Sequence, residues 1–324
     1  MSGEQIKEFL GDDWKRMHIL FHSALGCDIA FLQKINDSVA SHTGKQIRPM
    51  VCLLAAYLCS GGANEDCCRY AASIELMHNA TLMHDDVADE SSERRGYPTI
   101  SAMLGQVPAV LVGDYWLAKA VESIIVTANY TQVVPLFTHT MRGLAEGEML
   151  QIQNAISATT TEDDYLRVIY CKTASLFKCA AVCGAISVKA SDAQLKACSE
   201  YAVALGNAFQ IKDDILDYTG TDALGKPHGA DIKERKITLP LLGALRNRPD
   251  KESEIRKMVC TIPEHPEYAE QITDFVLKNG GVEFASSRLE EYIESAVRAL
   301  DIFEDSQAKK YLEDIVRYNT IRSV

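Results

Sequence analysis

Three aspartates stand close together in the stretch MHDDVADESSERRG, which covers residues 83–96. Asp85 and Asp89 are four positions apart, so on a helix they project from one face, with Asp86 beside them. Like charges at that spacing destabilise a helix by roughly 0.2–0.5 kcal/mol. Mg²⁺ compensates such a cluster because it binds a few carboxylate oxygens and leaves its other positions to water and phosphate. The spacing therefore predicts a magnesium site, although a solvated acidic surface has the same composition.

The same D-D-x-x-D spacing recurs in FQIKDDILDYTG, residues 209–220. There Asp213, Asp214 and Asp217 again end an apolar helical pattern ahead of a loop that contains glycine. One acidic cluster is common on protein surfaces, but two copies in the same helical context are not expected by chance. If the two helices face each other, metal ions on both walls can share the charge of a diphosphate.

Basic residues accompany both clusters and could bind the phosphate oxygens that metal leaves uncovered. Arginine supplies a fork of donors and lysine a point charge, and both bind phosphate. Each one alone is more commonly a surface charge. The candidates are Arg94 and Arg95 after the first cluster, Lys226 and Lys236 after the second, Lys45 and Arg48 in TGKQIRP, and Lys172 in YCKTASLF.

The elements that must position these residues are helices. Apolar residues recur at three- and four-residue spacing almost throughout, as in MVCLLAAYLCSGG and YAVALGNAFQIKDDILDY, and strand signals are scarce. Several of these helices are apolar around most of their circumference, which places them at the centre of a bundle. No linker-like tract and no repeat interrupts the pattern, so we expect one large all-α domain over residues 1–324.

Composition narrows the class of protein. A formal net charge of −12 argues against nucleic acid as a partner, and 47% hydrophobic residues argue against disorder. The first residues lack a basic run followed by an apolar one, and charge interrupts every apolar stretch before membrane-spanning length. Ten cysteines include no C-x-x-C pair, which favours buried reduced thiols. We therefore expect a cytoplasmic protein with no transmembrane segment.

Seven motifs together resemble those of the trans-isoprenyl diphosphate synthases, the polyprenyl synthetase family, and most closely its long-chain, octaprenyl-type members. From about residue 43 onward they are GKQIRP, HDDVADESSERRG, VGDYWLAKA, EGEMLQ, KTASLF, FQIKDDILD and GKPHGADIKERKITLP. The resemblance implies an all-α bundle with a deep central cavity, assembled as a homodimer. It implies a Mg²⁺-dependent 1′-4 condensation of isopentenyl diphosphate with an allylic diphosphate, farnesyl or geranyl, using about three Mg²⁺ per active site.

The resemblance also assigns roles. The implied metal ligands are Asp85, Asp86, Asp89, Asp213 and Asp214, with Asp217 in support. The implied partners of the allylic diphosphate are Arg94, Lys172, Thr173, Gln210, Lys226 and Lys236, of which Lys172 and Lys226 count with the aspartates as catalytic. The implied partners of isopentenyl diphosphate are Lys45, Arg48, His78 and Arg95. The family's first basic motif is Gly-Gly-Lys-Arg-x-Arg-Pro, from which this chain departs at Thr43 and Gln46 while it retains both cations.

Product length depends on the same helix. In this family a bulky aromatic residue four or five positions before the first aspartate is taken as the floor of the cavity. Its presence is typical of enzymes that make short products. Here those positions hold Thr81 and Ala80, with Met77 one turn further down. The resemblance thus predicts a long product of about C35–C45, because the cavity limits chain length. Geranylgeranyl diphosphate is the alternative, and Trp116 or Tyr115 could form the floor, the protein core or an interface.

Three other functions account for part of this pattern. A class I terpene cyclase shares the first cluster but usually has an Asn/Ser/Glu-type second motif, which the intact DDILD does not match. A non-catalytic subunit of a heteromeric synthase is expected to lack an acidic motif or several basic residues, and none is lost here. A purely structural bundle leaves both acidic clusters unexplained.

Overall fold

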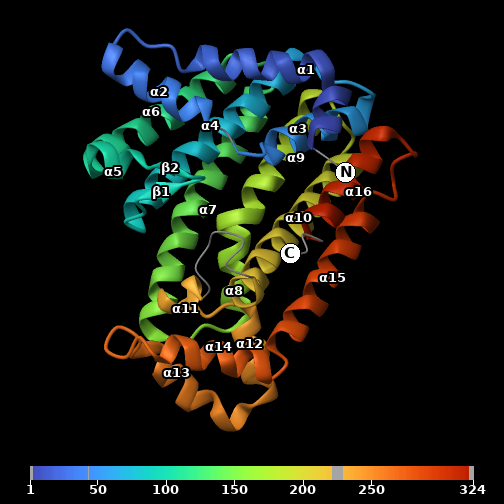
Figure 1. Cartoon of the computed structure of the whole chain (residues 1–324). Coiled ribbons are helices and arrows are strands. Elements are labelled where there is room, and N and C mark those ends of the chain that lie inside the picture. Colours follow the sequence, from blue (N-terminus) through green and yellow to red (C-terminus); the bar gives the residue numbers. More distant parts are fainter. Residues whose placement is uncertain (1–2, 43, 221–228, 321–324) are drawn as a thin grey trace. The chain divides into compact units, whose positions relative to one another are not determined.

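The computed structural model describes residues 3–42, 44–220 and 229–320, with side chains described up to residue 317. Within these residues the chain is almost entirely helical (Figure 1), so the predicted all-α class is confirmed. The exception is a short antiparallel hairpin of β1 (Glu93–Arg94) and β2 (Tyr97–Pro98), with Arg94 opposite Tyr97. This hairpin directly follows the first acidic cluster.

The chain divides into two compact units. The first comprises residues 1–138, 179–199 and 302–312, and the second comprises residues 139–178, 200–301 and 313–324. Four helices contribute residues to both units: α7 (Tyr130–Ser157), α9 (Ser175–Ser187), α10 (Asp192–Thr219) and α16 (Gln307–Thr320). The expectation of one domain over residues 1–324 remains a prediction.

The first unit is built around α4, which is buried along most of its length and packs against α1, α3 and α6. Trp116 of α6 is fully buried there, donates a hydrogen bond from Nε1 to Asn36 Oδ1 (2.9 Å) and packs edge-on against Phe21. It is a core residue of this unit. The helices that lie wholly within this unit are α1 (Gly3–Ala24), α2 (Ala30–Ser41), α3 (Ile47–Ser60), α4 (Glu65–Ala88), α5 (Ile100–Leu104) and α6 (Gln106–Ile125).

The second unit has its own apolar core, centred on Leu241, Ile272 and Val276 of helices α12 and α14. Its further elements are α8 (Glu162–Ile169), the π-helical turn η1 (Tyr170–Ala174), α11 (Ala230–Lys233), α12 (Leu239–Asn247), the 3₁₀ turn η3 (Pro249–Lys251), α13 (Glu252–Cys260), α14 (Tyr268–Lys278) and α15 (Gly281–Ala299). Gly206 of α10 allows close packing, because a Cβ there would lie 2.4 Å from Ala174 Cα of η1.

One helical stretch is long and apolar enough to cross a membrane. In the described part of the chain only residues 162–187 meet that criterion, with a mean hydropathy of 1.3. Of the 18-residue window that meets the criterion, 67% is buried inside the protein, and the core helix of a water-soluble protein meets the same criterion. The stretch is weak evidence for a membrane span, and the absence of a transmembrane segment remains a prediction.

Candidate active site

The first acidic cluster lies at the C-terminal end of α4. Asp85 and Asp86 belong to its last turn, and Asp89 caps it, with its backbone N–H donating to Asp85 O at 2.8 Å. A helix carries partial negative charge at this end, which favours basic residues there, yet the last turn of α4 has none. The helix dipole therefore disfavours carboxylates at this end, and cations close to them offset that cost.

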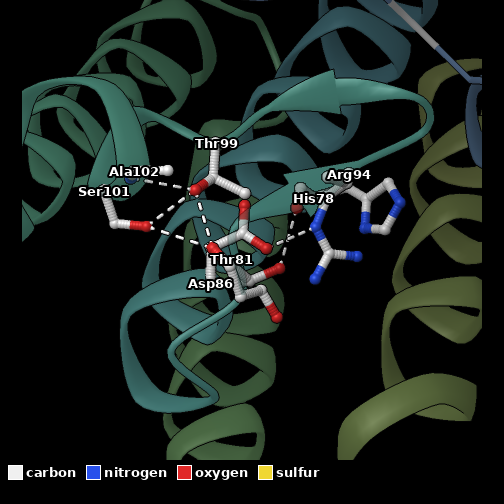
Figure 2. A network of polar contacts seen from close by, with 8 residues as sticks. His78, Thr81, Asp86, Arg94, Thr99, Ser101 and Ala102 are labelled. Carbon is white, nitrogen blue, oxygen red and sulfur yellow. Dashed lines mark hydrogen bonds and ion pairs between the residues drawn. The ribbon is translucent and has the colours of Figure 1, made fainter.

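Asp86 is directed towards the hairpin. It is 6% exposed, whereas Asp89 is exposed, and its Oδ1 accepts a hydrogen bond of 2.6 Å from Arg94 Nε. Figure 2 shows Arg94 reaching across from β1 to this carboxylate. Burial raises the pKa of Asp86, and the Arg94 guanidinium opposes that rise. Asp86 thus orients Arg94 in this structure, and its role as a metal ligand remains a prediction.

Thr99 closes the loop that presents the two arginines. Its buried Oγ1 donates to Ser91 O at 2.7 Å and accepts from the backbone N–H of Ala102 (Figure 2). Through the second bond Thr99 also caps the start of α5. Its own N–H donates to Ser92 O at 3.1 Å. These bonds tie both ends of the hairpin to α5, which matters because an isolated two-stranded hairpin is marginally stable.

Arg95 occupies the turn of the hairpin in a left-handed conformation. Its φ is 56°, and that of the following Gly96 is 82°, as a two-residue hairpin turn requires. A non-glycine residue is strained there, so neighbouring contacts must hold it. Arg95 Nη1 donates to His42 O at 3.1 Å, and the guanidinium lies against Gly44, where a Cβ would approach Cζ to 2.7 Å. The Gly44 of the first basic motif thus leaves room for Arg95.

Arg48 and His78 lie together in the same unit. Arg48 Nη1 lies 3.1 Å from His78 Nε2, and because a guanidinium can only donate, Nε2 accepts and Nδ1 carries the proton. Burial first, and then the nearby Arg48, Arg95 and Arg94, hold the pKa of His78 well below its usual range. The imidazole is therefore neutral at pH 7, with an N–H available for a phosphate oxygen. Lys45 is exposed just before α3.

We expect His78 to make the folded protein less stable in mild acid. The unfolded chain binds the proton with a pKa of about 6.5, whereas folded His78 resists it, so the free energy of unfolding falls as pH drops below that value. His78→Gln keeps an acceptor for Arg48 and should remove this component, so its free energy of unfolding falls less steeply between pH 7 and pH 5. Urea titrations across that range measure the slope, with the exposed His139→Gln as control. Parallel slopes for His78→Gln and the parent would contradict the prediction.

The second acidic cluster lies at the C-terminal end of α10, where again no basic residue stands in the last turn. Asp213 is exposed and Asp214 is 2% exposed. Asp217 accepts hydrogen bonds from the backbone N–H groups of Ala230 (3.1 Å) and Asp231 (3.2 Å), so it fixes the start of α11. Of the three, Asp213 is the carboxylate most open to solvent.

Asp214 is held by a chain of hydrogen bonds. It accepts from Tyr165 Oη at 2.6 Å and from Gln210 Nε2 at 2.9 Å, while Gln210 Oε1 accepts from Thr173 Oγ1 at 2.9 Å. Burial, followed by the charge of Asp231, raises the pKa of Asp214 to about 8. A bound divalent cation reverses this, because it favours the ionised carboxylate. The predicted residues Thr173, Gln210 and Asp214 are thus brought together.

Lys172 lies within the π-helical turn η1. Such turns are rare in helices and frequent at functional sites. Its Nζ forms an ion pair with Glu148 and donates to Gln151 Oε1 at 3.1 Å. Gly147 permits this approach, because a Cβ there would lie 2.6 Å from Cys171 Cβ. The EGEMLQ motif therefore serves to place Lys172.

A cavity of about 140 Å³ lies within the second unit at these residues. Its polar lining includes Gln151, Asn154, Tyr165, Lys172, Gln210, Asp214, Asp231 and Lys236. Asn154 is 8% exposed, and among the described residues its Nδ2 has no hydrogen-bond partner. A buried donor without a partner costs free energy that a phosphate oxygen would recover. The cavity therefore fits an anionic ligand, and Lys236, which pairs with Glu234, stands at its wall.

The donor set fits magnesium better than zinc. No three His, Cys, Asp or Glu side chains of the described residues form a ready-made metal site. Structural zinc needs four such ligands, whereas Mg²⁺ binds through one or two carboxylates and takes its remaining ligands from water and phosphate. Exposed carboxylates beside lysines and arginines suit the second arrangement.

Several residues that surround the second acidic cluster were not predicted from the sequence. Tyr165 and Asn154 carry no motif, and Asp231 was passed over although it stands in the GKPHGAD stretch beside a cavity lysine. The predicted Lys226 lies outside the described residues. Of the chain-length candidates, Ala80 and Met77 are fully buried, and Thr81 is half-buried with Oγ1 donating to His78 O at 2.8 Å.

Known proteins are similar to this chain over nearly its whole length. A model of the polyprenyl synthetase family matches residues 29–276. The all-trans-nonaprenyl-diphosphate synthase (geranyl-diphosphate specific) of Rhodobacter capsulatus is 36% identical over 310 residues, 95% of this chain and 94% of that protein. The octaprenyl diphosphate synthase of Escherichia coli (strain K12) is 34% identical over 313 residues, 96% of each chain.

A solved structure is also similar to this chain in fold. The polyprenyl synthase from Caulobacter crescentus CB15, complexed with calcium and isoprenyl diphosphate, superimposes with a TM-score of 0.90 over 99% of this chain and 98% of that one, at 30% identity. Fold, motifs and sequence similarity lead to the same conclusion. This chain belongs to the polyprenyl synthetase family and has its all-α isoprenoid synthase fold.

Proposed function

We propose that this prenyltransferase condenses isopentenyl diphosphate with farnesyl or geranyl diphosphate, head to tail and with Mg²⁺, into an all-trans polyprenyl diphosphate of about C35–C45. The observation that carries the proposal is the pair of acidic clusters at the C-terminal ends of α4 and α10, each without a basic residue in the last turn. The names of the nonaprenyl and octaprenyl relatives support a long product. The calcium and isoprenyl diphosphate in the Caulobacter crescentus structure support a divalent metal and a prenyl diphosphate.

In this proposal both acidic clusters and the basic residues that accompany them act on isopentenyl diphosphate and the allylic diphosphate. Lys172, Lys236 and Arg94 bind the allylic diphosphate, and Asn154 Nδ2 donates to one of its oxygens. Magnesium held by the aspartates supplies positive charge that stabilises the departing diphosphate. The C–O bond breaks with its electron pair on the diphosphate, the isopentenyl double bond attacks the allylic carbon, and a proton leaves to the released diphosphate. No protein nucleophile is needed, and apolar walls keep water from the cation.

The test of this function is an elongation assay. The purified protein is incubated with Mg²⁺, labelled isopentenyl diphosphate and farnesyl diphosphate, and the dephosphorylated products are separated by length. A ladder that ends at one long polyprenol supports the proposal in full. A product that stops at geranylgeraniol keeps the reaction but refutes the long chain. No incorporation, with or without EDTA, favours the terpene cyclase or the non-catalytic subunit.

We also propose a homodimer that forms through α5 and α6. These adjacent helices expose a run of apolar side chains: Met103 (52%), Leu104 (39%), Val107 (70%), Val110 (37%) and Leu111 (61%). Contiguous exposed apolar surface of this kind marks protein–protein interfaces. We expect the parent to sediment as a dimer and Val107→Asp/Leu111→Asp as a monomer, with the exposed Ile302→Asp as control. A dimeric double variant would place the interface elsewhere.

We further place the enzyme in the cytoplasm, without a nucleic-acid partner. All ten cysteines are free, although Cys59 and Cys198 bring their sulfurs within 3.9 Å. We expect these thiols to stay reduced, as they would in a reducing compartment.

A further inference from the structure

Two cysteines that are far apart in the sequence lie side by side in the first unit. Cys59 belongs to the last turn of α3, and Cys198, 139 positions further along the chain, belongs to the second turn of α10. Their sulfurs are 3.9 Å apart, so one thiol donates a hydrogen bond to the other. Neither residue has a role in the proposed function. Two adjacent thiols on different helices can instead be joined by a disulfide.

Hydrogen bonds at the start of α10 hold it against the end of α3. Ser191 and Gln194 form a capping box, in which the Ser191 N–H donates to Gln194 Oε1 at 2.9 Å and the Gln194 N–H donates to Ser191 Oγ at 3.4 Å. The same Gln194 donates a long hydrogen bond of 3.5 Å from Nε2 to Cys59 O. Cys198 is four positions after Gln194 and therefore lies on the same face of α10, one turn further along. The two thiols thus meet beside a bond between their helices.

The end of α3 is also held by α9. Asn64, which follows α3, donates from Nδ2 to Ser187 O in the last turn of α9 at 2.7 Å. Gly184 packs so closely on Cys52 O of α3 that no Cβ would fit between them. A disulfide needs about 2.0 Å between its sulfurs, a distance that rotation of the two cysteine side chains can supply. The helices themselves are already in place for the bond.

The two thiols differ in access and in acidity. Cys198 is 2% exposed, whereas Cys59 is half-buried. The hydrogen bond from Cys198 lowers the pKa of Cys59, while the hydrogen bond to Cys59 and burial raise the pKa of Cys198. The thiolate is the form that attacks a disulfide. Cys59 is therefore the thiol that an oxidant from solution reaches, and Cys198 reacts only with a sulfur already attached at Cys59.

We propose that Cys59 and Cys198 are a thiol–disulfide site, which joins the end of α3 to the start of α10 when oxidised glutathione accumulates. Cys59 loses its proton to solvent and attacks the glutathione disulfide, whose S–S bond breaks with its electron pair on one glutathione, which takes up a proton. Cys198 then loses its proton and attacks Cys59 Sγ, which releases the second glutathione as a thiol. Two protein thiols lose two electrons, and one glutathione disulfide gains them and becomes two thiols.

The first experiment maps the thiols after oxidation. The full-length protein is incubated with oxidised glutathione, the remaining thiols are alkylated, and the peptides are identified by mass spectrometry. We expect one cross-link between Cys59 and Cys198, which dithiothreitol releases. Cys198→Ser should stop at a glutathione on Cys59, whereas Cys59→Ser should leave Cys198 unmodified. Free Cys59 and Cys198 in the oxidised parent would overturn the proposal, and so would glutathione on Cys198 in Cys59→Ser.

A second pair of cysteines is the matched control within the same sample. Cys179 and Cys183 also have their sulfurs 3.9 Å apart, but both residues are fully buried and lie one turn apart on a single helix, α9. We expect both to remain thiols under conditions that join Cys59 to Cys198. Equal cross-linking of the two pairs would overturn the proposal, because the reaction would then not depend on the access that Cys59 provides.

Thermal unfolding tests whether the bond fits the native arrangement. A cross-link over 139 positions restricts the unfolded chain, so the oxidised parent should melt about 5 °C above the reduced parent. Cys59→Ser should melt at the same temperature in both buffers. An oxidised parent that melts at or below the temperature of the reduced one would overturn the proposal, because the bond would then strain the helices. None of these readouts depends on turnover, so the outcome is independent of the proposed function.

Discussion

Asp85→Ala and Asp213→Ala are each expected to lower turnover at least about a thousandfold, because metal-ion stabilisation of a departing diphosphate is worth several kcal/mol. Asp85 lies in the last turn of α4, and Asp213 lies about two turns before the end of α10. Neither carboxylate is at the end of a helix that favours negative charge, so the free energy of unfolding should stay within about 0.5 kcal/mol of the parent while activity collapses. Steady-state assays and urea unfolding on the same preparations measure both effects.

Asp163→Ala is the control for that pair of measurements. Asp163 is exposed in the first turn of α8, the end of a helix that favours negative charge. We expect its removal to keep activity and to lower stability slightly, because negative charge is favourable at that position. Turnover within a few-fold of the parent in Asp85→Ala or Asp213→Ala would refute the metal assignment. A marked loss of stability in either would show that the carboxylate has a structural role.

Thr81→Phe is expected to shorten the product from about C35–C45 to about C20, because an aromatic ring there would block the path of the growing chain. Thr81 is half-buried, so a larger side chain can be accommodated at this position. Ala80 differs, since it is fully buried and a ring there would overpack the core at a cost of about 1–3 kcal/mol.

Product analysis of Thr81→Phe and of the conservative control Thr81→Ser tests this. The first condensation steps should proceed at a rate close to that of the parent, because the residues proposed to bind the two diphosphates are unchanged. A full-length product from Thr81→Phe would show that the chain does not pass Thr81. Ala80→Phe is expected to lose thermal stability as well, and for that reason it is the less informative variant.

The sequence predicts the helical class and both acidic clusters because these depend on local spacing. Asp85 and Asp89 are one turn apart in any helix, and the apolar period around them gives the helix itself. Spacing does not predict which partner a side chain faces in the folded protein. Asp86 is adjacent to Asp85 in sequence yet bonds to Arg94, because a hairpin of two-residue strands brings that arginine over the helix.

Residues that depend on tertiary packing escaped prediction for a related reason. Tyr165 bonds to Asp214 across 49 positions, and neither its type nor its spacing distinguishes it from a core tyrosine. The π-helical turn around Lys172 packs closely against Gly147, and a five-residue irregularity leaves no periodic signal.

Thr99 connects the hairpin that carries the two arginines with the helix of the proposed dimer interface. The same side chain closes the hairpin and caps α5, the helix that begins the proposed subunit interface. In a dimer formed there, ordering of Arg94 and Arg95 by substrate would favour the α5 conformation that the partner contacts. Thermodynamic linkage then requires reciprocity, so that substrate tightens the dimer by the factor by which dimerisation tightens substrate binding. Dilution below the dimer dissociation constant would thus weaken the enzyme's affinity for its substrates, and substrate would protect the assembly from dilution.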